Sequence, residues 1–413
     1  MAARGGRDEL PPMLTPAQLM TVFMATEPRI DFLKPPWFTG TRQHDKDVDY
    51  DELPDEKDLD ELPQEKDQDE LPQEKERDKL PHEKDYDELL QEMDDNEFFQ
   101  QIRVTKKTHA FILSIVRKNY IPVYRGGNFP LDARLALDVT LTYLGSNSTY
   151  RVISELFGLS QTGVYSCVKK IVKVLCDVGG DFIKWPSAQE APDLEKDFRG
   201  VAGFTGVIGA LGGTHISIKT PNNLKTNYIN SDKKHSVILM ATCDNKKKFT
   251  YIDVGTPGSA DDNSAFTSSS LYTGISEDAQ AYFSSPSHHI IGDLAFTLSH
   301  HVMVPFIDTG GLTYDEVRYN TKLSKTRGVI ERTYELLKAR FMRLQYVDAE
   351  INRISNIITA ACVLHNITCN FPEEEVTLLR EGAIPIAEDI ESIAEILYYS
   401  TASDKRNYLV LTL

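Results

Sequence analysis

Apolar positions recur at helical spacing between residues 97 and 175, where the chain first has a globular composition. Residues 97–120 and 132–145 each predict helical structure, and residues 149–175 predict two helices joined by a short turn that contains Gly158. Two helices joined in this way are typical of a helix-turn-helix unit. The second helix has an apolar stripe formed by Val164, Val168, Ile171 and Leu175.

The polar side of that second helix is a candidate DNA-binding surface. Short polar residues are followed by lysines, an order that suits a helix whose first turn faces bases and whose later turns meet phosphates. An ordinary amphipathic helix with a solvated lysine face has the same pattern, so both interpretations stay open. The residues outside the apolar stripe are Gln161, Thr162, Tyr165, Ser166, Lys169, Lys170 and Lys173.

From about residue 200 the pattern changes to short apolar runs. Three strands are predicted by VIGAL with HISI, by SVILMATC and by FTYIDVG, and the lysines at 246–248 fit a hairpin turn between the last two. A helix over 261–274, a short strand at HHIIGD and helices over 322–345 and 351–367 follow. Consecutive strands followed by a helix, a strand and more helices predict a mixed α/β sheet.

Residues 51–95 are five copies of a nine-residue repeat, from DELPDEKDL to DELLQEMDD. A proline in four copies interrupts any helix and the like charges repel, so this tract is expected to be disordered. It holds 21 acidic and 6 basic residues, a net charge of −15, whereas the other 368 residues hold 41 and 39, a net charge of −2. The tract is either a solvated product of repeat expansion or an acidic arm that competes with DNA or recruits a basic partner.

The cysteines and the apolar runs indicate an intracellular chain. No cysteines form a CxxC pair and their number is odd, which predicts reduced thiols and argues against a disulfide scaffold or a zinc finger. The N-terminus has no apolar signal core, and no run of about 18 apolar residues predicts a membrane span. We therefore expect no membrane partner and a location in the nucleus, with the cytoplasm as a second location. The cysteines are Cys167, Cys176, Cys243, Cys362 and Cys369.

Three acidic residues lie where a divalent-metal nuclease needs them. Asp262 follows a predicted strand in GTPGSADDNSAF, Asp293 ends the strand HHIIGD, and Glu331 lies on the helix over 322–345. Phosphodiester cleavage uses two Mg²⁺ or Mn²⁺ ions about 3.5–4 Å apart, held by carboxylates that converge from different elements. Taken singly, such an aspartate is more often a helix cap, and a glutamate one turn after Arg327 is more often a surface ion pair.

Seven segments, taken together and in order, resemble the PIF/Harbinger transposase family and the nucleases derived from it. They are FFQQIRVTKKTHAFIL, RLALDVTLTYLGSNSTYRVISELFGLS, VIGALGGTHISIKTP, HSVILMATCDNKKKFTYIDVGTPGSADDNSAF, IIGDLAF, TRGVIERTYELLKARF and VLHNI. The resemblance implies an α/β protein with a ribonuclease-H-like mixed-sheet core and an N-terminal all-α helix-turn-helix domain. It implies metal-dependent DNA cleavage with Mg²⁺ or Mn²⁺, and a Myb/SANT-like nuclear partner. It also implies that Asp262 is the second catalytic acid, Asp293 a further metal ligand and Glu331 the closing glutamate.

The chain departs from the family pattern at the first acid. The resemblance implies an acid before Gly-Thr-His, and this chain has Gly212 there. His215 should point to the opposite side of the strand and is a poor ligand for Mg²⁺. Asp261 lies on the same element as Asp262, so it cannot easily take a position on another strand. We therefore expect weak or absent hydrolysis of phosphodiester bonds; the alternative functions are a non-catalytic regulator that binds DNA or a partner, and a degraded element copy.

Two further groups of residues have competing interpretations. The segment over 219–234 contains residues that either line a DNA groove or belong to a solvated loop, namely Lys219, Lys225, Asn227, Tyr228, Asn230, Lys233 and Lys234. His365 and Asn366 lie on a strongly apolar helix and are expected to be buried structural residues.

The expected domains follow from these elements. They are an N-terminal tail over 1–45, the disordered acidic repeats over 46–96, a helical helix-turn-helix domain over 97–185, a nuclease-like catalytic domain over 200–370 and a helical C-terminal tail over 371–413.

Overall fold

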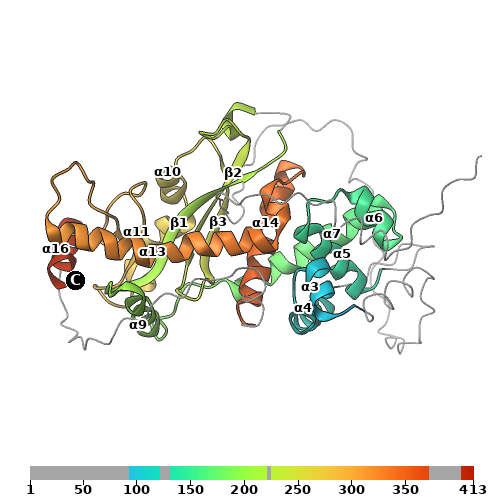
Figure 1. Cartoon of the computed structure of the whole chain (residues 1–413), viewed down its shortest axis with the longest axis horizontal. Helices are drawn as coiled ribbons and strands as arrows, with labels where there is room; N and C mark the ends of the chain where they lie inside the picture. Colours follow the sequence, from blue (N-terminus) through green and yellow to red (C-terminus); the bar gives the residue numbers. More distant parts are fainter. Residues whose placement is uncertain (1–92, 121–130, 221–224, 372–400) are drawn as a thin grey trace, which may run out of the picture.

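A computed structural model describes residues 93–120, 131–220, 225–371 and 401–413 of the chain. The predicted tail over 1–45 and the repeats as far as residue 92 lie outside the described residues. Figure 1 shows an elongated molecule with a group of helices at one end and a sheet beside the long helix α13 (Tyr314–Arg340). The small helix α16 (Ala402–Thr412) lies at the opposite end.

The helical end is built from five helices around a shared apolar core. The predicted helical region over 97–120 is divided in two, because Arg103 adopts a left-handed conformation and the Thr105 side chain caps a new helix. A capping box at Asp94 and Glu97 begins the first helix within the last residues of the fifth repeat. The helices are α3 (Asp95–Ile102), α4 (Lys106–Asn119), α5 (Ala133–Gly145), α6 (Tyr150–Phe157) and α7 (Gln161–Asp177).

The predicted mixed α/β sheet is confirmed and has five strands in the order β3-β2-β1-β4-β5. The three long strands β1, β2 and β3 run antiparallel to one another, whereas β4 and β5 continue the sheet in parallel from β1. Every residue of β2 is buried, as its continuous apolar run predicts. The strands are β1 (Val207–Ser217), β2 (Ser236–Cys243), β3 (Phe249–Pro257), β4 (His289–Ile291) and β5 (Val302–Met303).

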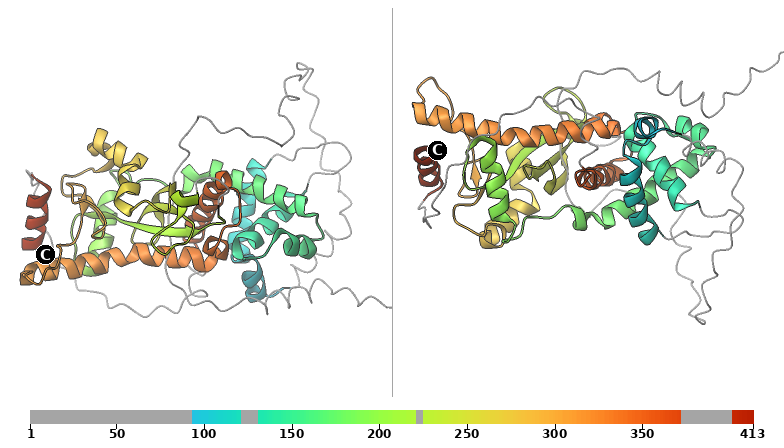
Figure 2. Two further views of the ribbon diagram at one scale, coloured as in Figure 1. Left: turned by 90° about the horizontal axis from the view of Figure 1, so that it is seen from above. Right: turned by 60° about the horizontal axis from the view of Figure 1, so that its bottom comes forward.

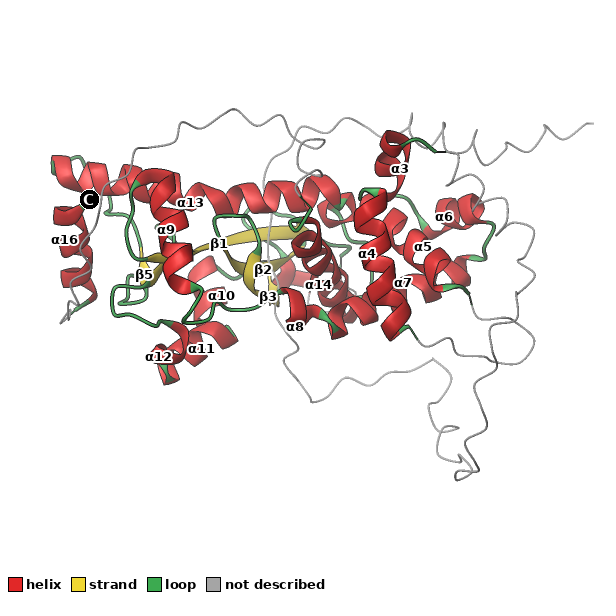
Figure 3. Cartoon of the chain, turned by 90° about the horizontal axis from the view of Figure 1, so that it is seen from below, coloured by secondary structure: helices red, strands yellow, loops and turns green. Residues whose placement is uncertain are grey.

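Helices cover both sides of the sheet. In Figures 2 and 3 the helix α13 runs along one side of the sheet, while α11 (Ser270–Glu277) and α12 (Ala279–Tyr282) lie on the other. The predicted helix over 261–274 is interrupted because Ser269 caps a second helix after α10 (Asp262–Thr267). The remaining short elements are α8 (Gly179–Phe182), α9 (Ala191–Ala202), η2 (Lys225–Tyr228) and η3 (Met342–Gln345).

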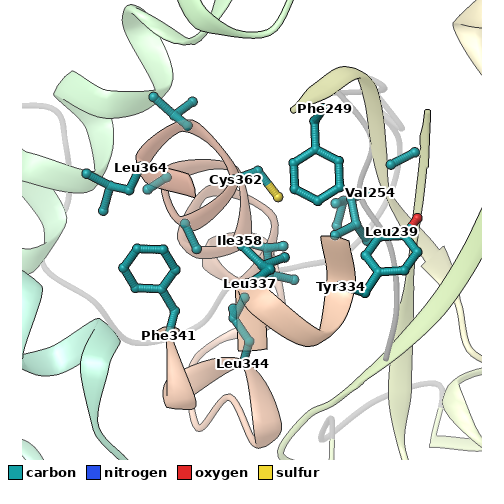
Figure 4. Packing of buried hydrophobic residues seen from close by; sticks show 14 of the residues in the cluster. Leu239, Phe249, Val254, Tyr334, Leu337, Phe341, Leu344, Ile358, Cys362 and Leu364 are labelled. Carbon is teal, nitrogen blue, oxygen red and sulfur yellow. The ribbon is translucent and has the colours of Figure 1, made fainter. Parts of the chain in front are cut away.

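The core is continuous from the sheet to the helical end. Helix α14 (Ile351–Thr368) lies between them and packs on both β3 and α7. Figure 4 shows Ile358 and Cys362 of α14 near Phe249 of β3 and near Leu337 and Phe341 at the end of α13. Burial of these side chains therefore ties the sheet and the helices into one hydrophobic core.

Hydrogen bonds from Lys405 join α16 to the segments that lead into β4 and β5 of the sheet. The Lys405 ammonium is buried and donates hydrogen bonds to the carbonyl oxygens of Pro286, His288 and His300 at 2.8, 2.8 and 2.9 Å. These carbonyls precede β4 and β5, so α16 holds the two short strands from their amino ends. Within the described residues, no helix is both long and apolar enough to span a membrane.

Candidate functional site

The sheet topology places the predicted acids at one end of the central strands. Asp262 begins α10 shortly after β3, Asp293 follows β4 by two residues, and Glu331 lies in the middle of α13. Gly212 lies on β1, two residues beyond the last position at which β1 pairs with β4. Position 212 and Asp293 are therefore each two residues beyond the paired residues Ala210 and Ile291 of parallel neighbours, so they lie at the same level of the sheet.

Asp261, and not Asp262, caps helix α10. The Asp261 carboxylate accepts hydrogen bonds from the Ser264 backbone nitrogen at 2.8 Å and the Ser264 hydroxyl at 2.9 Å. Among the described residues, no side chain donates a hydrogen bond to the Asp262 carboxylate, which is half-buried. The helix cap that the sequence suggested for this segment is therefore Asp261. The Asp262 carboxylate does not cap the helix and can have another role.

The electrostatic environment of Asp262 disfavours its ionised form. Burial, followed by the negative charges of Asp293 and Asp261, raises the pKa of Asp262 to about 6, against a smaller opposing effect of Arg327. Asp293 also accepts a hydrogen bond from the Ala295 backbone nitrogen at 2.9 Å. Two neighbouring carboxylates that repel each other would be stabilised by an added cation.

Arg327 joins Glu331 to Asp293. One terminal nitrogen of its guanidinium lies 2.9 Å from a Glu331 oxygen, and the other lies 3.5 Å from an Asp293 oxygen. The arginine side chain is 16% exposed, whereas those of Asp293 and Glu331 are 37% and 49% exposed. The interpretation of Glu331 as the partner of an arginine is confirmed, and the arginine also reaches a second acid.

Gly212 faces α13 at close range. A Cβ atom at position 212 would lie 2.9 Å from Cγ2 and 3.1 Å from Cγ1 of Ile330. The hydroxyl of Tyr334, one turn further along α13, donates a hydrogen bond to the Gly212 carbonyl oxygen at 2.9 Å. The position of the missing acid thus lies against the helix that carries Glu331, and the space for a side chain is taken by Ile330.

His215 lies on the other face of β1, as the alternation of strand residues predicts. Its Nδ1 is 3.0 Å from the Ser236 hydroxyl of β2, and burial lowers the pKa of its imidazole. Among the residues that the structure describes, no group of three or more His, Cys, Asp or Glu side chains is close enough together to hold a metal ion. The roles of Asp262, Asp293 and Glu331 as metal ligands therefore stay predictions.

The predicted DNA-binding face of α7 is divided in the structure. Gln161, Thr162, Lys169 and Lys173 are exposed, and the Lys173 ammonium is 3.0 Å from Asp177. Two other candidates are half-buried by internal contacts. The Tyr165 ring lies under the guanidinium of Arg353 on α14, at 4.2 Å, and the Lys170 ammonium lies 5.7 Å from the centre of the Tyr120 ring.

The loop over 219–234 is tied to its surroundings at several points. The Lys219 ammonium is 2.8 Å from Asp348, and the buried Asn230 accepts a hydrogen bond from the Lys234 backbone nitrogen at 3.0 Å. The Asn227 carbonyl accepts a hydrogen bond from the Ser259 backbone nitrogen at 3.2 Å, which brings the loop near Asp262. Tyr228 is half-buried, whereas the side chains of Lys233 and Lys234 are exposed.

His365 and Asn366 are structural, as predicted. A His365 ring nitrogen is 2.8 Å from the Lys247 carbonyl oxygen, and burial lowers the pKa of this histidine to about 4. The Asn366 side chain binds both the backbone nitrogen and the carbonyl oxygen of Phe249, at 2.8 and 2.7 Å. Both residues therefore hold the start of β3 against α14.

Sequence reasoning missed the part of α13 that faces the site. Ile330, Tyr334 and Lys338 lie on one side of the helix, and the Lys338 ammonium donates to the His215 carbonyl oxygen at 3.1 Å. Burial lowers the pKa of Lys338 to about 7. The spacing of these residues at helical intervals is the one signal in the sequence that could have grouped them.

Comparison with known proteins identifies the segment that carries these acids. Residues 211–366 match the family described as DDE superfamily endonuclease. The chain is 31% identical over 237 residues to "Putative nuclease HARBI1" of Rattus norvegicus, covering 55% of this chain and 65% of that protein. It is 31% identical over 236 residues to the protein of that name from Homo sapiens, again with 55% and 65% coverage. It is 23% identical over 290 residues to "Protein ALP1-like" of Arabidopsis thaliana, with 66% and 70% coverage.

The match to these relatives is partial in length. The chain spans 65% of the HARBI1 proteins from rat and human. No solved structure matches the chain.

Proposed function

We propose that the chain is a domesticated transposase-derived nuclease-like protein. Residues 211–366 match the DDE superfamily endonuclease family, and the chain is similar to the proteins named HARBI1 and ALP1-like. Its divalent-metal-dependent hydrolysis of DNA phosphodiester bonds is impaired because Gly212 replaces the first acid. The observation that carries this proposal is geometric. Arg327 joins Glu331 of α13 to Asp293 after β4, and Gly212 of the central strand faces the same helix.

The order of the strands supports a ribonuclease-H-like core. Three antiparallel strands followed by two parallel ones, in the order 3-2-1-4-5, agree with the fold that the resemblance implies. The same proposal divides the chain into two domains. One is a helical domain over 97–185, in which α6 and α7 form the helix-turn-helix, and the other is a catalytic domain over 200–370.

The donor set fits one divalent cation better than two. Asp262 and Asp293 offer the hard oxygen ligands that Mg²⁺ and Mn²⁺ prefer, and their mutual repulsion favours an added positive charge. Gly212 offers no ligand, and Glu331 is held by Arg327. When bound, such ions supply an activated water and stabilise the departing oxygen. Asp262 and Asp293 would hold the ion, and Glu331 would join them as the closing acid only after leaving Arg327.

Nicking of supercoiled plasmid DNA with Mg²⁺ or Mn²⁺ tests this function. The natural chain is compared with Gly212→Asp combined with Ile330→Ala, which makes room for the new side chain. We expect the double variant to nick faster than the natural chain, and the addition of Asp262→Asn to abolish the gain. If the natural chain nicks as fast as the double variant, the claim of impairment is wrong. If no variant nicks while all are folded and bind DNA, the chain is not a metal nuclease with one missing acid.

A second function, in which the chain binds DNA or a partner without cleaving DNA, is favoured by the ion pair of Glu331. A closing acid that is neutralised by Arg327 is poorly placed to assist catalysis, while α7 presents exposed polar and basic residues. Binding of duplex DNA by this surface would be metal-independent and would weaken with salt. The family resemblance also leads us to propose that DNA and a Myb/SANT-like protein are partners of the chain. It leads us to propose that the chain is located in the nucleus.

Fluorescence anisotropy with labelled duplex DNA separates these functions. Lys169→Gln on α7 is expected to weaken binding and to reduce the salt dependence by about one ion. Lys196→Gln, which removes an exposed lysine from α9, is the matched control. Equal loss of affinity in the two variants would mean that α7 is not the DNA-binding element.

A further inference from the structure

Arg327 occupies a particular position among the acids of the site. It lies one helical turn before Glu331 on α13, and its guanidinium extends from Glu331 to Asp293, which follows β4. The arginine is more deeply buried than either carboxylate that it contacts. It therefore lies beneath the acids, as a fixed positive charge between two elements of the fold.

The formal charges of the site agree with one further divalent cation. Asp262, Asp293 and Glu331 together carry −3 when ionised, and Arg327 reduces this charge to −2. The carboxylate of Asp261 is exposed and caps α10, so solvent screens its charge and it is not counted here. One divalent ion neutralises that charge, whereas two would leave an excess of positive charge in a half-buried place. Like charges repel each other more strongly in such a place than in water, because less solvent screens them.

We propose that Arg327 takes the place of one cation in this site, so that the chain without DNA binds a single divalent ion through Asp262 and Asp293, while Glu331 stays paired with Arg327 and is not a ligand in that state. This inference rests on the proposed function, because it concerns the cation that a nuclease-like site would bind. It assigns Arg327 a positioning role: the guanidinium keeps the Glu331 carboxylate in an ion pair, so that it would not bind the cation, and it fixes the carboxylate of Asp293.

Binding of Mn²⁺ in the absence of DNA tests the inference without any turnover. Electron paramagnetic resonance counts the free ion, and calorimetry gives the stoichiometry and the dissociation constant. We expect the natural chain to bind one ion, and Asp262→Asn or Asp293→Asn to lose it. Arg327→Gln is expected to bind Mn²⁺ at least about fivefold more tightly, or to bind a second ion, because Glu331 is released and a repelling charge is removed.

The role of Glu331 is tested in two backgrounds. In the natural chain Glu331→Gln should leave Mn²⁺ affinity within about twofold, whereas in the Arg327→Gln chain it should remove the gain. Arg327→Lys keeps the positive charge and should behave like the natural chain. Arg332→Gln, which removes the partner of Glu335 at 3.0 Å further along α13, is the matched control and should change nothing. Circular dichroism and thermal melting verify that each variant is folded.

The outcomes separate this inference from the proposed function. If Glu331→Gln weakens binding in the natural chain as much as Asp293→Asn does, Glu331 is a ligand and the inference is wrong. If the natural chain and Arg327→Gln bind Mn²⁺ equally, Arg327 does not act as a cation of the site, and only the inference falls. If neither binds Mn²⁺, the metal-dependent part of the proposed function falls with it.

Discussion

At the scale of single residues, the loss of one carboxylate has structural as well as chemical consequences. Position 212 lacks a ligand, and the volume that a side chain would need is filled by Ile330. Ile330 is β-branched and lies on a helix, so its side chain has little freedom to turn away. Restoring the chemistry of this position therefore requires a change on α13 as well as on β1.

We expect Gly212→Asp alone to destabilise the fold by ~1–3 kcal/mol, because a Cβ would lie 2.9 Å from Ile330. Urea denaturation measures the free energy of unfolding. In a chain that already carries Ile330→Ala, the further substitution Gly212→Asp should cost less free energy of unfolding than it does in the natural chain. The reason is that the two side chains compete for one space. If the effects of the two substitutions on the free energy of unfolding are additive, contact with Ile330 is not the cause of the loss of stability in Gly212→Asp.

Asp262→Asn should stabilise the metal-free protein at pH 7. The folded-state pKa of Asp262, about 6, lies above its ordinary value of 3.8, so this carboxyl favours folding below pH about 4, and its contribution is lost as the pH rises through 6. The expected gain in the free energy of unfolding, measured with a chelator present, is ~1–2 kcal/mol at pH 7 after allowance for solvent screening, and it should vanish near pH 4.

Asp261→Asn is the matched control for this prediction. Asparagine also caps helices well, and hydrogen bonds from Ser264 lower the pKa of Asp261, which is the opposite direction. This variant should therefore not gain stability between pH 4 and pH 7. A loss of stability in Asp262→Asn at pH 7 would show that the carboxylate has a stabilising partner in the folded protein.

At the scale of elements, apolar patterns predicted the long strands and the helix α14, but helix ends depended on local caps. Helix α13 begins at Tyr314, earlier than the predicted 322, because Thr313 and Glu316 form a capping box. That signal, Thr-x-x-Glu, is visible in the sequence. The two-residue strand β5 is too short to give any pattern, and its place is set by pairing with β4.

In the candidate site, too, contacts within one element were predictable from the sequence, whereas contacts between elements were not. The spacing of Arg327 and Glu331 along one helix allowed their ion pair to be anticipated. The contact of Ile330 with Gly212 and the approach of Arg327 to Asp293 join elements that are far apart in the chain. Such contacts are decided by the packing of α13 on the sheet, which the spacing of residues in a sequence does not specify.

Lys405 should control the docking of α16. All three protons of its ammonium can be donated to the carbonyls of Pro286, His288 and His300, and Lys405→Met would leave these three acceptors, which are buried or partly buried, without that donor. We expect a loss of ~2–4 kcal/mol and faster amide hydrogen exchange in α16. Asn407→Gln, at an exposed position of the same helix, is the control. Unchanged exchange in Lys405→Met would mean that the apolar contacts of α16 suffice.

At the scale of the whole molecule, two arginines near the end of α13 connect the sheet to the helical end. Arg340 donates a hydrogen bond to the Arg103 carbonyl oxygen at 2.8 Å. The buried Arg343 guanidinium lies 4.2 Å from the centre of the Tyr143 ring and donates to the carbonyl oxygens of Tyr143 and Ser148. Helix α13 thus carries Glu331 in its middle. Its last residues reach the helical end of the molecule, to which α7 belongs.

Arg343→Met should loosen this connection while leaving each part folded. The substitution keeps much of the apolar length of the side chain but removes the donors to two carbonyls, at a cost of ~2–4 kcal/mol. Differential scanning calorimetry is expected to show one transition for the natural chain and two for the variant, because the helical end and the sheet would then unfold separately. Arg332→Gln, at a half-buried position of α13 that pairs with Glu335, should keep a single transition. A single transition in Arg343→Met, shifted to lower temperature, would mean that the packing of α14 on α7 and β3 is enough to make the two parts unfold together.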